Sequence, residues 1–390
     1  MFMVTVMKLP IYFDYAATTP VDTKVAEAMS ECLAIEGNFG NPASRSHVLG
    51  WKAEEAVEAS RKQVADFIGA DVREIIWTSG ATEANNLALK GVVEAAGDGE
   101  VHIITSKIEH KSVLDTCEYL EGRGVTVTYV SPSMNGCVSL DAIYAAITNK
   151  TRLISLMHAN NETGAINDIA TLGAYCRKRG ILLHVDAAQT LGKIDLNVHA
   201  YNVDLLSMSA HKIYGPKGAG ALYVRRHPDV KVVAQIHGGG HERGMRSGTL
   251  ATHQIVGFAK ALEVAATLQK PEADRLASMR ENFISGLTSL EGVHINGGEG
   301  SHHLPGIINI GFDGIDGETL LLSLRNLALS SGSACTSATV EPSYVLTAMG
   351  VPTVLAHNAL RFSFGRYTKT SDIELAVDKI CSAVTAMRCT

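Results

Sequence analysis

Residues 207–218 read Ser-Met-Ser-Ala-His-Lys-Ile-Tyr-Gly-Pro-Lys-Gly, and they close an apolar run of the chain. Small, hydroxylic and imidazole side chains surround Lys212 in this stretch. Removing a lysine ammonium from water is costly, and a lysine that forms a covalent Schiff base with an aldehyde avoids that cost. The alternative is a surface lysine in a turn, because turn chemistry explains Gly215-Pro216 without any ligand.

Short apolar segments alternate with helical segments around this stretch. The strand candidates are residues 74–78, 101–105, 125–130, 152–157, 181–185, 203–208 and 219–224. Helical periodicity is found at residues 47–68, 82–95, 110–121, 140–147 and 168–178. Such alternation predicts an α/β fold with a largely parallel sheet covered by helices on both faces. Active sites of such folds gather in the loops that follow the strands.

The length of 390 residues exceeds the size at which one hydrophobic core stops growing, so we expect two domains. A helix at 251–267 is followed by Gln269-Lys-Pro-Glu-Ala-Asp274, which we interpret as a break before a second helix at 272–288. The predicted boundary separates a large domain, residues 23–268, from a small domain made of residues 1–22 and 269–390. The small domain is predicted to be α+β, with strands near 306–312 and 359–364 and helices near 317–327 and 371–386.

Composition and charge narrow the class of partner. Hydrophobic residues make up 46% and charged residues 19% of the chain, as in an ordinary globular protein. A net charge of −6 argues against a nucleic-acid partner, because no basic excess can neutralise a phosphate backbone. The seven cysteines are scattered without a CxxC pair, which is typical of a reducing compartment. The apolar residues 1–10 are too short to span a bilayer, so we expect a cytoplasmic protein, with Met7 as a second candidate start.

Two motifs at strand ends offer ligands for a cofactor. Thr78-Ser-Gly-Ala-Thr-Glu83 opens a helix, so its backbone N–H groups and Thr82 are placed to hold a phosphate, unless the motif is only a helix cap. It lacks the P-loop spacing, which disfavours nucleotide hydrolysis. Asp186 ends an apolar segment and needs a positive partner such as a protonated pyridine nitrogen, although it could instead cap the next turn. With a Schiff-base lysine at position 212, this pairing indicates pyridoxal phosphate (PLP).

His110 and Asn161 follow two other predicted strands. The imidazole of His110 could stack on an aromatic cofactor or shuttle a proton, or it could simply start a helix. Asn161 lies in the segment His158–Gly164, whose amides could bind an oxygen of a cofactor or substrate. Loop-forming asparagines are common, so this signal carries little by itself.

The segment 237–249 contains His237 and His241, four residues apart. Three glycines between them disfavour the helix that HExxH metal chemistry needs, so we predict no structural metal site. An anion-binding loop, which could cross a subunit interface, fits the remaining side chains better: Arg243, Arg246, Ser247 and Thr249.

Cys335 lies in residues 330–339, a run of small residues with little apolar bulk to pack a thiol. We therefore favour a reactive thiol, although free cysteines are more often small core residues. Arg361, inside a predicted strand, suits a bidentate grip on a carboxylate, with a structural ion pair as the alternative.

Together these motifs resemble those of the IscS/NifS-type (group I) cysteine desulfurases, which are fold-type I PLP-dependent enzymes. The resemblance runs from Leu9 to about Thr370. The motifs that carry it are Tyr12-Phe-Asp-Tyr-Ala-Ala-Thr-Thr-Pro, Gly40-Asn-Pro, Thr78-Ser-Gly-Ala-Thr-Glu, His184-Val-Asp-Ala-Ala-Gln, Ser209-Ala-His-Lys, Arg243-Gly-Met-Arg-Ser-Gly-Thr and Ser331-Gly-Ser-Ala-Cys-Thr-Ser.

The resemblance implies which residues bind the cofactor. Lys212 would carry PLP as a Schiff base, His110 would stack on its ring and move protons, and Asp186 would pair with the pyridine nitrogen. Gln189 would contact the phenolic oxygen. Thr249 would reach the phosphate from the neighbouring subunit of a homodimer. The implied cofactor-binding set is Ala81, Thr82, Asn161, Asp186, Gln189, Ser209, His211, Lys212 and Thr249, with Thr82, Ser209 and His211 at the phosphate.

The implied activity is conversion of L-cysteine to L-alanine, with Asn161 and Arg361 orienting the substrate carboxylate. Lys212 would take the Cα proton, and the Cys335 thiolate would attack the substrate sulfur. A loop at 328–340 would then carry the persulfide to an iron–sulfur scaffold or a tRNA-thiolation protein, and Cys335 could be a transient iron–sulfur ligand. Family members continue beyond the point where this chain ends, and that tail helps to dock the scaffold. The chain is thus expected to be truncated or to serve another acceptor.

Two rival classes of function stand against this one: another enzyme on the same fold, and a non-catalytic subunit. A selenocysteine lyase or a PLP aminotransferase would share the fold, but neither reaction requires a cysteine at position 335. A non-catalytic interaction subunit would have no need of the lysine, aspartate, histidine and cysteine that are all present. Preference between cysteine and selenocysteine is not determined by the sequence.

Overall fold

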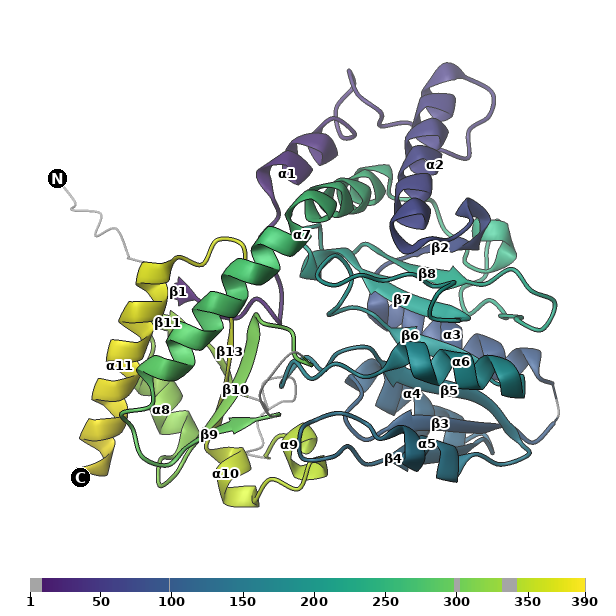
Figure 1. Ribbon diagram of the computed structural model, residues 1–390. Coiled ribbons are helices and arrows are strands. Elements are labelled where there is room, and N and C mark those ends of the chain that lie inside the picture. Colours follow the sequence, from purple (N-terminus) through teal and green to yellow (C-terminus); the bar gives the residue numbers. More distant parts are fainter. Residues whose placement is uncertain (1–8, 98, 298–301, 332–341, 390) are drawn as a thin grey trace.

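The computed structural model describes residues 9–97, 99–297, 302–331 and 342–389 (Figure 1). Its main sheet has seven strands in the order β2-β8-β7-β6-β5-β3-β4, parallel except for β8, which runs antiparallel to both of its neighbours. The bounds are β2 (Ile75–Thr78), β3 (His102–Ser106), β4 (Thr126–Val130), β5 (Thr151–Met157), β6 (Leu182–Asp186), β7 (Leu205–Ser209) and β8 (Gly220–Val224). The predicted α/β fold with a largely parallel sheet is confirmed.

Helices cover both faces of this sheet, as Figure 1 shows. On one face lie α3 (Ala81–Ala95) and α4 (Lys111–Glu121), in one buried apolar cluster with Ile76 of β2. On the other face lie α2 (Val48–Ile68), α5 (Leu140–Ala146), α6 (Ile169–Arg179) and the first half of α7, in a second cluster with Ile75 and Trp77. Neighbouring residues of β2 thus enter opposite clusters, because side chains alternate across a strand.

The predicted helix break at 269–274 is wrong. A single helix, α7 (Thr252–Gly286), runs through this segment with Pro271 inside it. An interior proline removes a hydrogen bond and costs about 3 kcal/mol. The helix nevertheless continues, because its first half buries Phe258 in the main core and its second half buries Leu276 and Phe283 in another. Each such buried side chain contributes about 1.5–3 kcal/mol, so packing outweighs the proline.

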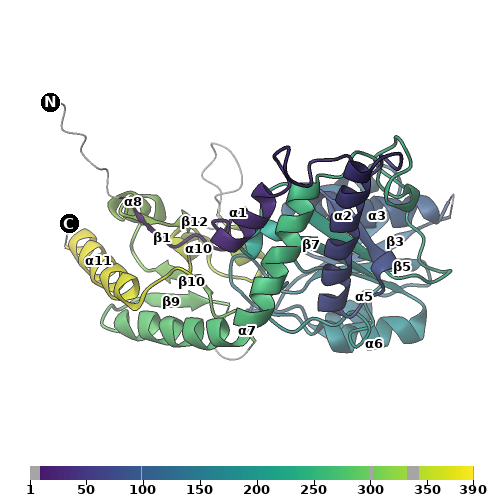
Figure 2. The ribbon, with the colours of Figure 1, turned by 90° about the horizontal axis from the view of Figure 1, so that it is seen from above.

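A second, antiparallel sheet has the order β12-β13-β10-β9. Its strands are β9 (Val293–Asn296), β10 (Ile307–Phe312), β12 (Ser330–Ser331) and β13 (Ala359–Ser363), and α8 (Gly317–Ser323) and α11 (Thr370–Arg388) add side chains to its apolar cluster. The helix predicted at 317–327 is shorter than expected, since α8 ends at Ser323. Leu327 belongs instead to β11 (Leu327–Ala328), which pairs with β1 (Ile11–Tyr12). Figure 2 shows the two sheets side by side with α7 spanning both.

The remaining described elements are short. They are the helices α1 (Thr23–Ser30), α9 (Tyr344–Ala348) and α10 (Thr353–His357) and the 3₁₀ turns η1 (Val72–Glu74), η2 (Ala210–Lys212) and η3 (Glu242–Gly244). No helix in the described ranges is both long and apolar enough to cross a bilayer.

Candidate active site

The carboxyl ends of five strands meet at one edge of the main sheet. Strands β3, β5, β6 and β7 are parallel, and β2 shares their direction because it is antiparallel to β8, which is itself antiparallel to β7. The loops that follow these five strands therefore lie together, as parallel-sheet geometry predicts. Each loop carries predicted site residues.

A cavity of about 490 Å³ opens at this edge. Ten predicted site residues line it: Ala81, Thr82, His110, Asn161, Asp186, Gln189, Ser209, His211, Lys212 and Arg361. Arg361 comes from β13 of the second sheet, so the cavity lies between the two sheets. Thr249 is not among the lining residues and is exposed, and Cys335 lies outside the described residues.

Lys212 ends η2, directly after β7, and its Nζ donates to the carbonyl oxygens of Ala16 (2.5 Å) and Ala17 (2.7 Å). Burial, followed by the positive charges of Lys193 and Arg361, lowers the pKa of Lys212 to about 7. A substantial fraction of this lysine is therefore a neutral amine near pH 7, the form that attacks an aldehyde. Lys212 lines a cavity, so the simple surface-turn alternative does not describe it.

Asp186 is the last residue of β6 and is 6% exposed. Its Oδ1 accepts from the backbone N–H of Ala188 (2.9 Å), so the turn-capping alternative is also realised. Its Oδ2 accepts from the side-chain amide of Asn85 (2.8 Å), a fully buried residue of α3. Both carboxylate oxygens thus accept hydrogen bonds, and the side chain lines the cavity, where it suits pairing with a cation.

His110 starts a helix and also lines the cavity. Its Nδ1 accepts from the backbone N–H of Ser112 (3.1 Å), so the residue caps α4, while its ring lines the cavity. Burial lowers the pKa of His110, and the charge of Lys212 adds to this while that of Asp186 opposes it. A neutral ring that accepts at Nδ1 carries its proton on Nε2.

The N-terminus of α3 is arranged to receive an anion. Its N-cap is Gly80, with φ of +153°, and no side chain of the described residues caps this helix, so first-turn N–H groups remain available. A Cβ atom at Gly220 would lie 2.4 Å from the Cα of Gly80, so only glycine allows β8 to approach this turn so closely. The side chains of Thr82, Ser209 and His211 line the same cavity as this turn.

Arg361 and Asn161 each present an unsatisfied polar atom. Arg361 donates to the carbonyl of Asn161 (3.0 Å) and to Asp14 Oδ1 (2.8 Å), so its ion-pair alternative is present. Its Nε and the Oδ1 of Asn161 are buried and have no hydrogen-bond partner among the residues that the structure describes, and both residues line the cavity. Because buried polar groups are normally paired, these atoms indicate a polar ligand.

The segment that carries Thr249 is held by a buried ion pair. Glu242 accepts two hydrogen bonds from the guanidinium of Arg61 on α2 (2.7 and 2.8 Å) and one from the backbone N–H of Trp77 (2.7 Å). Glu242 and Arg243 have positive φ values of +49° and +56°, a conformation rare outside glycine. His237 and His241 belong to no metal-binding cluster, since the described part of the chain has no group of three or more His, Cys, Asp or Glu side chains that could hold a metal.

Several residues of this site were not predicted from the sequence. They include Asn85, the carbonyls of Ala16 and Ala17, and Lys193, which donates from Nζ to Gln189 Oε1 (3.2 Å). A buried asparagine on an amphipathic helix was a usable signal for Asn85. The carbonyls carried no signal, because every residue has one.

This chain belongs to the aminotransferase class-V family, whose model matches residues 11–375. It is 56% identical over 382 residues to "Cysteine desulfurase IscS" of Pseudomonas aeruginosa, which covers 98% of this chain and 94% of that protein. The values are the same for "Cysteine desulfurase IscS" of Azotobacter vinelandii.

Solved structures give the same result. A "NifS-like protein" superimposes with a TM-score of 0.89 at 37% identity, covering 97% of this chain and all of that one. "SspA in complex with cysteine" has a TM-score of 0.83 at 39% identity, covering 92% of this chain and all of that one. The chain therefore has the fold of the fold-type I PLP-dependent enzymes, as predicted.

Proposed function

We propose that this chain is a PLP-dependent cysteine desulfurase that converts L-cysteine to L-alanine and passes the sulfur on as a persulfide. One observation of the structure supports it most: a lysine of lowered basicity, a doubly hydrogen-bonded carboxylate and two unsatisfied polar atoms face one cavity. The relatives named cysteine desulfurase agree with this activity. They do not favour the selenocysteine lyase or aminotransferase alternative.

The donor set of the cavity fits PLP. We assign Lys212 to the covalent link, Asp186 to the pyridine nitrogen, Gln189 to the phenolic oxygen and His110 to the ring face. The phosphate is assigned to the turn at the start of α3, with these neighbours: Ala81, Thr82, Ser209 and His211. When bound, PLP supplies an electron sink for the bonds at the substrate Cα.

Asn161 and Arg361 are assigned to the carboxylate of L-cysteine. The unsatisfied Nε of Arg361 supports this assignment, because it is a donor and a carboxylate accepts. The unsatisfied Oδ1 of Asn161 is an acceptor, so it suits a donor of the ligand, and its side-chain N–H groups are the atoms that could bind the carboxylate. The amine of Lys212 holds and moves the proton at the substrate Cα.

Cys335 is assigned to sulfur transfer. Its thiolate attacks the substrate sulfur, an S–S bond forms and the C–S bond breaks, and the substrate Cβ takes up a proton. L-cysteine and the Cys335 thiol thus become L-alanine and the Cys335 persulfide, without an external oxidant or reductant. An iron–sulfur scaffold or a tRNA-thiolation protein would accept this sulfur, and an iron–sulfur cluster bound at Cys335 would be cargo.

We further propose a cytoplasmic homodimer in which Thr249 completes the phosphate site of the second subunit. Thr249 is exposed on its own chain, which leaves it accessible to a second copy. A set of exposed apolar side chains between α1 and the start of α2 suits a subunit interface: Leu33, Ile35, Phe39, Val48 and Trp51. The apolar cluster of the second sheet supports a small domain made of residues 1–22 and 269–390, because it joins Phe13 to side chains from Leu276 to Val384. Residues of α9 and α10 pack instead in the cluster of the main sheet, so the proposed division from 23–268 is not a division of the cores at that point.

Labelled cysteine tests the function. We expect mass spectrometry to find labelled sulfur as a persulfide on Cys335 and labelled carbon in alanine. A reaction that yields alanine while Cys335 stays unmodified would contradict the proposed sulfur transfer. Adding a candidate acceptor protein to the same reaction tests delivery, because the label should move to it.

A further inference from the structure

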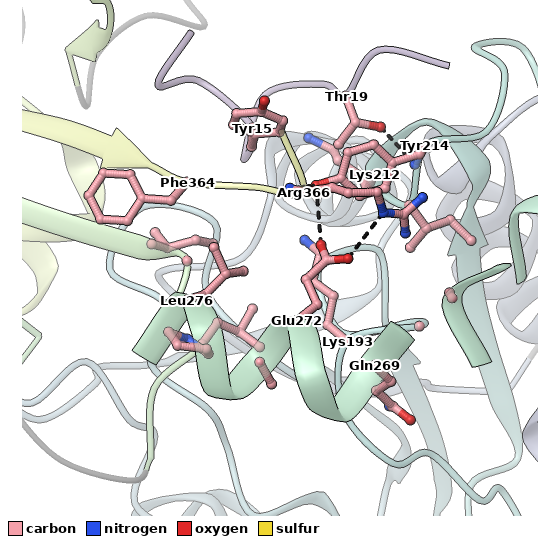
Figure 3. A pocket seen from close by; sticks show the side chains of 18 of the residues that line it. Tyr15, Thr19, Lys193, Lys212, Tyr214, Gln269, Glu272, Leu276, Phe364 and Arg366 are labelled. Atoms are coloured by element: carbon pink, nitrogen blue, oxygen red, sulfur yellow. Dashed lines mark hydrogen bonds and ion pairs between the residues drawn. The ribbon is translucent and has the colours of Figure 1, made fainter. Parts of the chain in front are cut away.

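Lys193 belongs to none of the motifs above, and the structure places it beside the candidate active site. It lies in the turn that follows β6, and it lines a second cavity on which Lys212 also borders. Figure 3 shows this cavity with Lys193, Lys212, Tyr214, Glu272 and Arg366 around it. We propose that Lys193 is a positioning residue, which orients the side-chain amide of Gln189 and holds a positive charge next to Lys212.

The amide orientation follows from hydrogen-bond chemistry. Lys193 Nζ lies 3.2 Å from Gln189 Oε1, and an ammonium group can only donate. The atom that it meets must therefore be the amide oxygen, which turns Nε2 of Gln189 toward the carbonyl of Ala16 at 2.9 Å. The second N–H of that amide remains for the cofactor oxygen that we assign to Gln189.

The same contacts link Lys193 to Lys212. The carbonyl of Ala16 accepts from Gln189 and also from Lys212 Nζ at 2.5 Å. A short hydrogen-bonded path thus runs from Lys193 through Gln189 and Ala16 to the amine of Lys212. Two contacts orient this amide, and removing Lys193 leaves only the hydrogen bond to the Ala16 carbonyl, so the amide is held less firmly.

Several titratable side chains surround the ammonium group of Lys193. The titratable side chains that share its cavity are Tyr15, Lys212, Tyr214, Glu272 and Arg366. Burial lowers the pKa of Lys193 to about 8, and the carboxylate of Glu272 on α7 opposes this shift. Lys193 is therefore mainly cationic at neutral pH. Its charge is the largest contribution, after burial, to the lowered pKa of Lys212.

Glu272 offsets this charge only in part. Within the described part of the chain it forms no ion pair with Lys193. It pairs instead with Arg366 at 3.1 Å and accepts from the Tyr214 hydroxyl at 3.3 Å. Figure 3 marks these two contacts. Because the Glu272 carboxylate raises the pKa of Lys193, removing it should leave Lys193 protonated less often and weaken its effect on Lys212, whereas changing Lys193 should remove that effect.

The test measures the absorption spectrum of bound PLP as a function of pH, so it rests on the proposed function but not on turnover. In Lys193→Met we expect the midpoint of the spectral titration to rise by about one pH unit, because a cation that opposes protonation at the Lys212 nitrogen is gone. Lys193→Arg keeps the charge and should stay near the wild-type midpoint. Lys270→Met, which removes an exposed lysine of α7 outside the cavity, is the matched control and should not shift.

Glu272→Gln provides a second test. Its midpoint should rise by less than that of Lys193→Met, because Lys193 without this carboxylate is protonated less often. Added to Lys193→Met, the same change should produce no further shift, which a purely structural defect would not reproduce. A midpoint in Lys193→Met equal to that of the wild type would overturn the proposal. If Lys193→Met does not retain PLP, the Glu272→Gln titration decides alone, and an unchanged or lower midpoint refutes the role of Lys193.

Failure of the underlying function gives a different result. A wild-type protein without a PLP absorption band, or a Lys212→Ala variant with an unchanged band, would refute the assignment of Lys212 itself. A normal wild-type band together with unshifted variants would refute only the role of Lys193.

Discussion

The ion pair of Arg61 with Glu242 offers a prediction whose magnitude follows from its geometry. Both side chains are 3% exposed, and the carboxylate receives two guanidinium hydrogen bonds and one backbone hydrogen bond. Breaking a buried pair by removing one partner typically costs about 3–5 kcal/mol, because the other charge stays buried without compensation. We therefore expect Arg61→Met to lower the free energy of unfolding by about that amount.

The next residue of α2 supplies a matched control. Lys62 forms an ion pair with Asp66, but the two side chains are 68% and 60% exposed. Exposed pairs contribute about 0–1 kcal/mol, so Lys62→Met should change the free energy of unfolding by no more than about 1 kcal/mol. Both variants remove one positive charge from the same helix, so a difference between them reports burial and not net charge.

Urea denaturation followed by tryptophan fluorescence is a suitable assay, because Arg61 lies 5.5 Å from the centre of the Trp77 ring and Glu242 binds the Trp77 backbone N–H. Glu242→Gln should cost less than Arg61→Met, since Arg61 keeps contacts with Glu58 and with a backbone carbonyl. The double variant should cost less than the sum of the two, because both remove the same interaction. An Arg61→Met protein as stable as Lys62→Met would refute this reasoning.

Three further predictions concern the reaction, the cofactor and the fold. Cys335→Ala should keep the PLP absorption of the wild type and lose sulfide release from cysteine in the presence of reductant; undiminished turnover would contradict the role of Cys335. The rate at which the apoenzyme captures PLP should increase with pH through about 7, the pKa of Lys212, and level off above it, because only the neutral amine attacks an aldehyde. Stopped-flow absorbance measures this rate. A rate that keeps rising up to the pH at which an ordinary lysine loses its proton would contradict the prediction. Leu276→Ala, in the core beyond Pro271, should lower the free energy of unfolding, measured by urea denaturation, by about 2–5 kcal/mol. Leu322→Ala, at a 75% exposed position, should lower it by about 0.5 kcal/mol or less. Equal losses would mean that burial of the second half of α7 does not stabilise the protein.

Local patterns predicted the parts of the site that depend on nearby residues. The strand ends were recognisable because short apolar runs stop at polar residues, and parallel strands bring those ends together. This is why the sequence alone predicts that Lys212, Asp186 and Asn161 lie close together. Thr249 and Cys335 remain predictions, since the first would act on a second subunit and the second lies outside the described residues.

The sequence by itself determined the α/β class, the order of strands and helices, and the chemical type of most site residues. These depend on periodicity and on side-chain chemistry, which are both local properties of the chain. Only the tertiary structure decided that α7 passes through Pro271, that Asn85 binds Asp186 and that Lys193 reaches Gln189 beside Lys212. A proline is tolerated when cores on both sides hold the helix, and a polar side chain gains its role from a partner that folding brings near. Neither the strength of packing nor the identity of a distant partner is written in the local sequence.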